Sequence, residues 1–90
     1  MSLPRAVAEA EITCQTAPWQ AEGRLWDGPI FYLRIRSEVA SLGFGSTLDE
    51  AIDDAIDGTR RICGCDHNVP WAPTDDEAWA LFDVLLAMKP

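Results

Sequence analysis

The sequence predicts a single α+β domain spanning residues 1–90, with a three-stranded antiparallel sheet and two helices packed on one face. Three observations predict this class. Residues 45–64 have the periodicity of an amphipathic helix with a signal at each end, residues 30–36 have the composition of a strand, and the elements follow the order strand, strand, strand, helix, loop, helix. A chain of 90 residues, 48% of them hydrophobic, can form one core without disulfide bonds.

The first predicted strand covers residues 5–15, where apolar and polar side chains alternate. One side carries Ala8, Ala10, Ile12 and Cys14, and the other carries Glu9, Glu11, Thr13 and Gln15. A period of two is typical of a half-buried strand, although the Ala and Glu content of residues 6–11 also permits a helix. We expect an irregular link at residues 18–23 and a short strand lead-in at residues 24–26.

The second and third predicted strands cover residues 30–36 and 39–44, after a turn signal at Asp27-Gly28-Pro29. The second is rich in β-branched and aromatic residues. Its side chains alternate, with Phe31, Leu33 and Ile35 on one side and Tyr32, Arg34 and Arg36 on the other. Gly43 and Gly45 weaken the end of the third strand and allow a tight entry into the next helix.

The central helix is predicted within residues 45–64. Thr47 and Glu50 have capping-box spacing, Arg60 and Arg61 fall in the expected last turn, and Gly64 suits the position after the helix. An apolar stripe at helical spacing is expected to face the core, formed by Leu48, Ile52, Ala55, Ile56, Thr59, Ile62 and Cys63.

The opposite side of this helix is acidic. It carries Asp49, Glu50, Asp53, Asp54 and Asp57. The net charge of −8 disfavours direct binding to nucleic acid, whose phosphates require Lys and Arg, and favours attraction to a basic surface of another protein. The alternative is a solvated face that only keeps the protein soluble and whose acids suit the helix N-terminus.

The second helix is predicted from Asp75 to about Met88, with a capping box formed by Thr74 and Glu77. Its apolar positions cover more than half of the helical wheel, so it must be buried on more than one side or meet a partner chain. We expect a homodimer interface formed by Trp79, Phe82 and Leu86.

Cysteine and histidine residues offer a possible zinc site at Cys63-x-Cys65-x-His67, with Cys14 as a fourth ligand. The one-residue gap between the cysteines is too short for the usual loop around zinc, so we expect no metal and no cofactor. Neighbouring side chains cannot form a catalytic triad either, so we expect no enzyme. The odd cysteine count predicts a reducing compartment, the cytoplasm, and no apolar run is long enough for a membrane span.

Two further groups of residues have more than one interpretation. Arg34 and Arg36 could bind phosphate or RNA, but we expect them to form cross-strand ion pairs with Glu9 and Glu11. The tryptophans outside periodic core positions could cover the edges of a small core or form interface hot spots: these are Trp19, Trp26 and Trp71.

The stretch from Pro29 to Arg61 resembles a known family. A strand, a short turn and a second strand ending in glycine lead into G-S-T-L-D-E-A-I-D-D-A-I, which is similar to the β-β-α core of HicB-like antitoxins and related small phage proteins. The resemblance implies a sheet-plus-helix core, like that of double-stranded-RNA-binding or ferredoxin-like domains, and a role in neutralising another protein. The chain has no recognisable DNA-binding tail of the kind that gives this family its repressor activity.

The leading hypothesis is a small, acidic, non-catalytic binding or inhibitor protein of the kind that phages and mobile elements encode. It would block a basic surface of a partner through the five acids of the central helix, in the manner of anti-CRISPR proteins that mimic nucleic acid. The first alternative is a HicB-like antitoxin module that neutralises a small toxin. The second is a structural domain with a minor zinc site.

Overall fold

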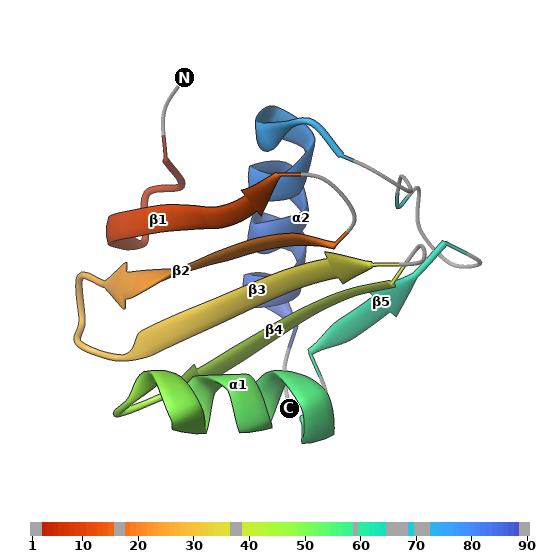
Figure 1. Ribbon diagram of the computed structural model, residues 1–90. Helices are drawn as coiled ribbons and strands as arrows, with labels where there is room; N and C mark the ends of the chain where they lie inside the picture. The colour runs from red at the N-terminus through yellow and green to blue at the C-terminus, as the bar shows by residue number, and fades with distance from the viewer. Residues whose placement is uncertain are drawn as a thin grey trace.

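The computed structural model describes residues 3–15, 18–36, 39–58, 60–64, 69 and 73–88. The described residues form five strands and two helices (Figure 1). The strands are β1 (Val7–Gln15), β2 (Trp19–Leu25), β3 (Ile30–Arg36), β4 (Val39–Gly45) and β5 (Arg61–Cys63), and the helices are α1 (Leu48–Asp57) and α2 (Asp75–Ala87). The predicted α+β class and the predicted strands over β1, β3 and β4 are confirmed.

The five strands pair in chain order as one antiparallel sheet, with β1 and β5 at its edges. The predicted number of three strands is therefore wrong. β2 lies where we expected a link, because Trp19, Ala21 and Leu25 alternate with polar residues and are buried. β5 lies where we expected the helix to continue, because Ile62 pairs opposite Ala40 and is buried in the core.

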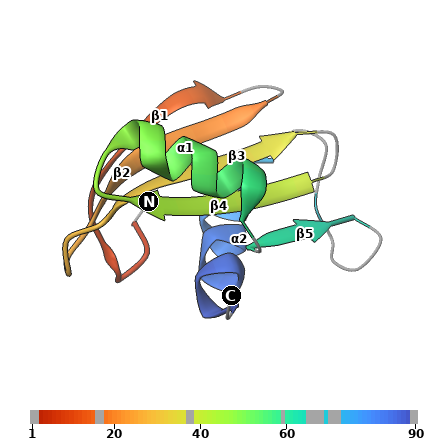
Figure 2. The ribbon, with the colours of Figure 1, turned by 90° about the horizontal axis from the view of Figure 1, so that it is seen from below.

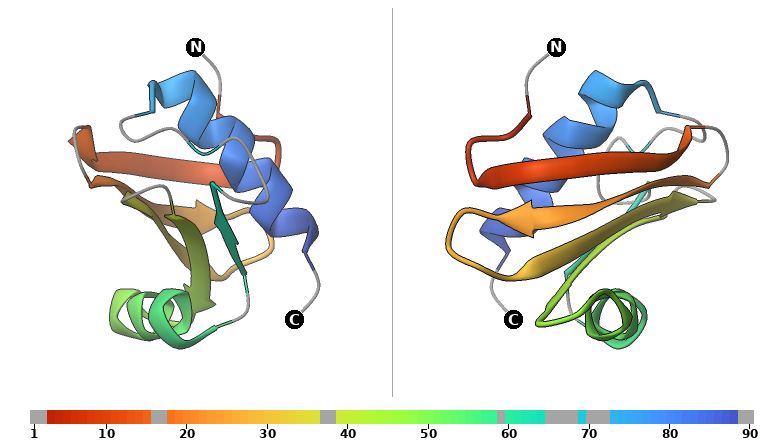
Figure 3. Two further views of the ribbon diagram at one scale, coloured as in Figure 1. Left: turned by 90° about the vertical axis from the view of Figure 1, so that its right-hand side faces the viewer. Right: turned by 60° about the vertical axis from the view of Figure 1, so that its left-hand side comes forward.

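The two helices lie on opposite faces of the sheet, as Figures 2 and 3 show from two directions. The prediction that they share one face is therefore wrong. The reason lies in β4, where consecutive residues are buried, a pattern typical of a strand covered on both faces. Ala40 and Leu42 belong to the core beneath α2, whereas the backbone of α1 passes directly over Gly43 on the other side.

The main core lies between α2 and the sheet and contains four aromatic rings. Trp79 packs edge-to-face on Trp19 with ring centroids 5.4 Å apart, and Phe82 packs on Phe31 at 5.0 Å. Trp79 is 4% exposed and Phe82 is fully buried, so these two residues cannot form the predicted dimer interface. Leu86 is partly buried at the edge of the same core. The predicted capping box of α2 is present, with both hydrogen bonds between Thr74 and Glu77.

Helix α1 begins at the predicted cap, with the Glu50 backbone N–H donating to Thr47 Oγ1 at 3.2 Å. The predicted capping box is only half formed, because the Glu50 carboxylate accepts from the backbone N–H of Ser46 and not from that of Thr47. It ends at Asp57, well before the predicted end, and Gly64 follows β5 instead. Its buried residues are Ala51 and Ala55. The predicted apolar stripe is turned to the side, so that Leu48 and Ile56 are 36% and 54% exposed.

Candidate functional site

The outward surface of α1 carries Asp49, Asp53 and Asp57, which we call the outer row. They are four residues apart, so they share one side of the helix at intervals of about 6 Å. All three are exposed. Within the part of the chain that the structure describes, none of them makes a hydrogen bond or an ion pair. Their carboxylates are therefore available to a partner.

The other two predicted acids of this face serve the fold. Glu50 Oε1 accepts a hydrogen bond from the backbone N–H of Ser46 at 3.0 Å, which closes the start of the helix. Asp54 Oδ2 accepts from the backbone N–H of Phe44 at 2.9 Å, which ties α1 to β4. All five predicted residues thus lie on one helix, but three of them make no hydrogen bond or ion pair within the described residues.

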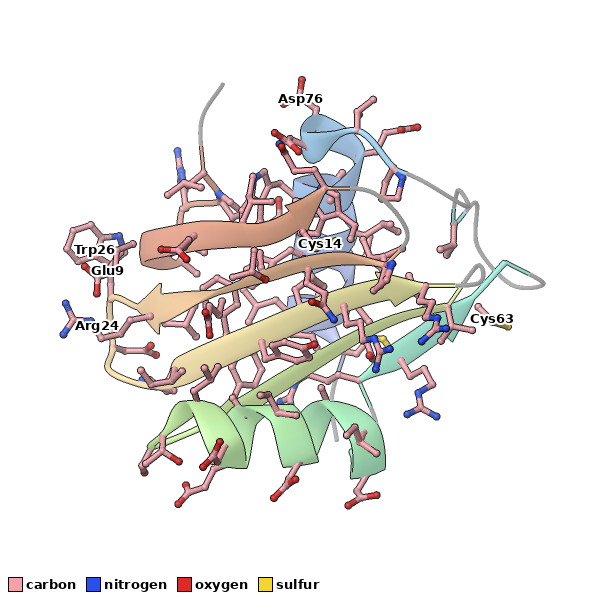
Figure 4. All side chains as sticks on the ribbon, in the orientation of Figure 1. Glu9, Cys14, Arg24, Trp26, Cys63 and Asp76 are labelled. Carbon is pink, nitrogen blue, oxygen red and sulfur yellow. The ribbon has the colours of Figure 1, made fainter. Side chains whose placement is uncertain are left out.

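The predicted ion pairs of Arg34 and Arg36 with Glu9 and Glu11 are absent, because β2 lies between β1 and β3. Glu9 instead contacts Arg24 on β2, with 3.7 Å between its carboxylate and the guanidinium. Figure 4 shows this pair at the end of the sheet where β2 turns into β3. Both side chains are largely exposed, so the pair contributes at most about 1 kcal/mol.

Arg34 and Arg36 line a pocket beside the C-terminal half of α1. We call it the arginine pocket, and its volume is about 300 Å³. Its lining consists of Tyr32, Arg34, Arg36, Val39, Ser41, Ala55, Ile56 and Arg61. The register places Arg34 opposite Ser41 on β4, and Ser41 opposite Arg61 on β5, so these residues form one row across the sheet.

Arg60 and Arg61 do not lie in the last turn of α1, as the sequence predicted, but after it. Arg61 still reaches back to the helix, and its Nη2 donates to the carbonyl oxygens of Ile56 at 2.6 Å and Ala55 at 3.4 Å. The cation therefore stabilises the negative end of the helix dipole from a neighbouring strand. The Arg60 guanidinium lies over the ring of Phe44, 4.9 Å from its centroid.

Tyr32 lies on the floor of the arginine pocket. Burial raises the pKa of its phenol above the usual value, the positive charge of Arg34 opposes this rise, and Glu22 adds to it. The phenol therefore remains protonated at neutral pH and can donate a hydrogen bond.

The candidate zinc ligands that the sequence analysis set aside are not assembled as a set in the described residues. Cys14 lies on β1 and Cys63 on β5, the opposite edges of the sheet, about 19 Å apart at normal strand spacing. Cys65 and His67 lie outside the described residues. Cys63 is disulfide-bonded, which the odd cysteine count did not predict and which is more typical of an oxidising compartment.

The tryptophans divide between the two interpretations. Trp19 is fully buried, and its indole N–H donates to Asp75 Oδ1 at 3.1 Å, so it is a core residue. Trp26 is 74% exposed in the turn after β2 and projects away from the sheet in Figure 4. Trp71 lies outside the described residues.

The sequence did not predict that Arg61 lies with Arg34 and Arg36 around one pocket. It assigned Arg61 to a helix, where it could not meet the strand arginines. One signal was present: Arg34, Arg36 and Arg61 are three of only seven basic residues in an acidic chain. Had residues 61–63 been assigned to a strand, a shared surface would have followed.

No protein-family model, curated protein or solved structure matches the chain. Neither helix of the described residues is long and apolar enough to cross a membrane.

Proposed function

We propose that the protein is a non-catalytic binding protein whose outer row docks on a basic surface of a partner protein. The observation that carries this proposal is the arrangement of Asp49, Asp53 and Asp57, which are exposed in one row and unengaged within the described residues. The proposal narrows the five acids of the sequence hypothesis to three, because Glu50 and Asp54 hold α1 in place.

The energetics of the row support a role in recognition. Like charges four residues apart destabilise a helix by about 0.2–0.5 kcal/mol per pair, and a cationic partner would relieve this repulsion. The charges act beyond direct contact over a Debye length of about 8 Å at physiological salt, and they accelerate association with an oppositely charged surface. The expected signature is a salt-dependent association rate.

The partner class follows from the charge. Strongly basic protein surfaces commonly bind nucleic acid, so a regular row of carboxylates would compete with phosphates for such a surface. This is the mode of action of nucleic-acid-mimicking anti-CRISPR proteins, and we propose a phage or mobile-element protein of that kind. We propose the cytoplasm as its location, because a partner that binds nucleic acid would be found there.

The partner can be identified by cross-linking from two positions. A photoreactive amino acid replaces Asp53 in one variant and Asp83, which is exposed on α2, in the other. We expect a basic protein to be captured from the Asp53 position only, with a yield that falls as salt is added. Equal capture from both positions would contradict docking through the outer row.

Two triple variants then test the row against net charge alone. Asp49→Asn, Asp53→Asn and Asp57→Asn remove the row, while Asp27→Asn, Asp76→Asn and Asp83→Asn remove three exposed acids elsewhere; each set changes the net charge from −8 to −5. We expect the first set to slow association with the captured partner about tenfold and the second to slow it less than twofold. Equal slowing would show that the acids act only through net charge.

A HicB-like antitoxin module is the second candidate. The observation in its favour is that β3, β4 and α1 follow one another as a hairpin and a helix within residues 29–61. This candidate predicts a gene for a small toxin beside the gene for this protein, and rescue of growth when both are expressed together. Growth arrest that persists on co-expression would contradict it.

A further inference from the structure

The arginine pocket is distinct from the outer row and has its own chemistry. It is formed by β3, β4, β5 and the last turns of α1, and its volume is about 300 Å³. Three of the seven basic residues of the chain line it, although the net charge of the protein is −8. None of the described residues that line the pocket is acidic.

Of the three arginines of the pocket, only Arg61 is anchored by hydrogen bonds, and none of the three makes an ion pair within the described residues. Arg61 is anchored by the carbonyl oxygen of Ile56 at 2.6 Å, which engages only part of its five N–H donors. Arg34 Nε is buried and has no hydrogen-bond partner among the described residues. An unpartnered buried donor is unfavourable unless a ligand supplies the acceptor. By contrast, Arg24 on the same face of the sheet already contacts a carboxylate.

Apart from Ser41, the remaining walls of the pocket are mostly apolar. Val39 and the Tyr32 ring lie on the sheet side, and Ile56, which is 54% exposed, borders the pocket from α1. Such walls suit a ring or another flat apolar group. The Tyr32 phenol adds a hydrogen-bond donor beside the guanidinium of Arg34.

We propose that the arginine pocket binds a phosphate monoester attached to an aromatic or heterocyclic ring, a small molecule of about the size of a mononucleotide. Three guanidinium groups match a phosphate dianion better than a singly charged carboxylate, because each can donate paired N–H groups to phosphate oxygens. A volume of about 300 Å³ is at the lower end of ligand pockets, which favours one ring and one phosphate over a longer molecule.

The test is an NMR titration of the isotopically labelled full chain with four probes: adenosine monophosphate, phenyl phosphate, inorganic phosphate and benzoate. We expect both ring phosphates to shift the amide signals of residues 32–36, 55–57 and 61–63, and to bind at least tenfold more tightly than inorganic phosphate or benzoate. No saturable shift with either ring phosphate would overturn the proposal. Equal affinity for all four probes would reduce the site to a non-selective anion site and would also overturn it.

Matched arginine variants locate the binding. Arg34→Gln and Arg36→Gln should each weaken binding of phenyl phosphate about 10- to 100-fold, while Arg24→Gln, on the same face of the sheet, should leave it unchanged. Arg36 is exposed, so its substitution keeps the test valid if Arg34→Gln impairs folding. Equal loss with Arg24→Gln would refute a localised site.

Two further outcomes separate this proposal from other functions. The triple Asn variant of the outer row should retain phosphate binding, so that failure of partner docking leaves the pocket testable. A single-stranded RNA oligonucleotide should bind no more tightly than the mononucleotide. Much tighter, length-dependent RNA binding would show a nucleic-acid surface and overturn the small-ligand proposal.

Discussion

Replacing Gly43 with alanine should displace helix α1 from the sheet. A Cβ at this position would lie 2.1 Å from the carbonyl oxygen of Ala51 and 2.3 Å from the backbone nitrogen of Ala55. The shorter distance is about 1.3 Å less than the 3.4 Å at which ordinary contact begins. Because both opposing atoms belong to the helix backbone, no side-chain rotation can relieve the clash, and the whole helix must move.

The expected cost is at the upper part of the range for overpacked cores, about 2–3 kcal/mol. For a domain of this size, each kcal/mol lowers the Tm by about 4–8 °C. We therefore expect Gly43→Ala to lower the Tm by about 10–20 °C in thermal unfolding followed by circular dichroism. The hydrogen bond from the Phe44 N–H to Asp54 should be lost as well, which would appear as faster amide exchange at Phe44.

Two controls make this prediction sharp. Ser41→Ala alters the same face of the same strand without adding volume, and it should change the Tm by only a few degrees. Combining Gly43→Ala with Ala51→Gly should give no rescue, because the clash is with the helix backbone and not with the Ala51 methyl group. An unchanged Tm for Gly43→Ala, or a rescue by Ala51→Gly, would refute the close approach of α1 to β4.

Three further predictions concern the core and the pocket. Asp75→Ala removes the acceptor of the buried Trp19 indole N–H and should cost about 1–3 kcal/mol of unfolding free energy in chemical denaturation; an unchanged midpoint would contradict the bond. Trp79→Glu should abolish the near-UV circular dichroism of the aromatic core, whereas a folded, soluble variant would place Trp79 at an interface. The pKa of Tyr32, the only tyrosine, should be raised when titrated by ultraviolet absorbance, and Arg34→Gln should raise it further. Because the unfolded chain loses this proton at a lower pH than the folded chain, the free energy of unfolding should fall as the pH rises through the pKa of the unfolded tyrosine. A measured pKa of Tyr32 at or below the usual value would contradict its burial.

Local signals in the sequence predicted the starts of the elements well. The threonine at position 47 and the threonine at position 74 each accept the expected hydrogen bond at a helix start. Alternation of side chains predicted β1, β3 and β4 to within about two residues. These features depend only on neighbours in the chain, so the sequence contains them directly.

The errors arose where contacts distant in the sequence decide the structure. The region from Gly58 onward has helical spacing of its apolar residues. In the structure, however, Ile62 pairs opposite Ala40 on β4, and this pairing buries its side chain in the core beneath α2. Likewise, the predicted apolar stripe of α1 is only partly correct: its small member Ala55 is buried, whereas Leu48 and Ile56 are exposed. Only small residues fit against the backbone of Gly43, so Ala55 faces the sheet together with Ala51, which the stripe did not include.

The two candidate sites also differ in whether they depend on chain neighbours or on contacts distant in the sequence. The outer row was predictable, because a helix places residues four apart on one side whatever it packs against. The arginine pocket was not, because it requires the true end of α1, the existence of β5 and the position of β2 between β1 and β3. In a sheet without β2, the first strand and β3 would be neighbours, so ion pairs between Arg34 and the acids of the first strand were expected in place of a pocket.

The position of α1 also explains how an acidic row and a basic pocket coexist so near each other without neutralising one another. With Ala51 and Ala55 against the sheet, Asp57 is exposed outside the pocket, whereas Ile56 lines it. Arg61 donates to the carbonyl at the helix end and not to a carboxylate. The negative end of the helix thus takes the place of an acid in holding this cation. The fold therefore places an acidic row on α1 beside a basic pocket whose arginines come from β3 and β5.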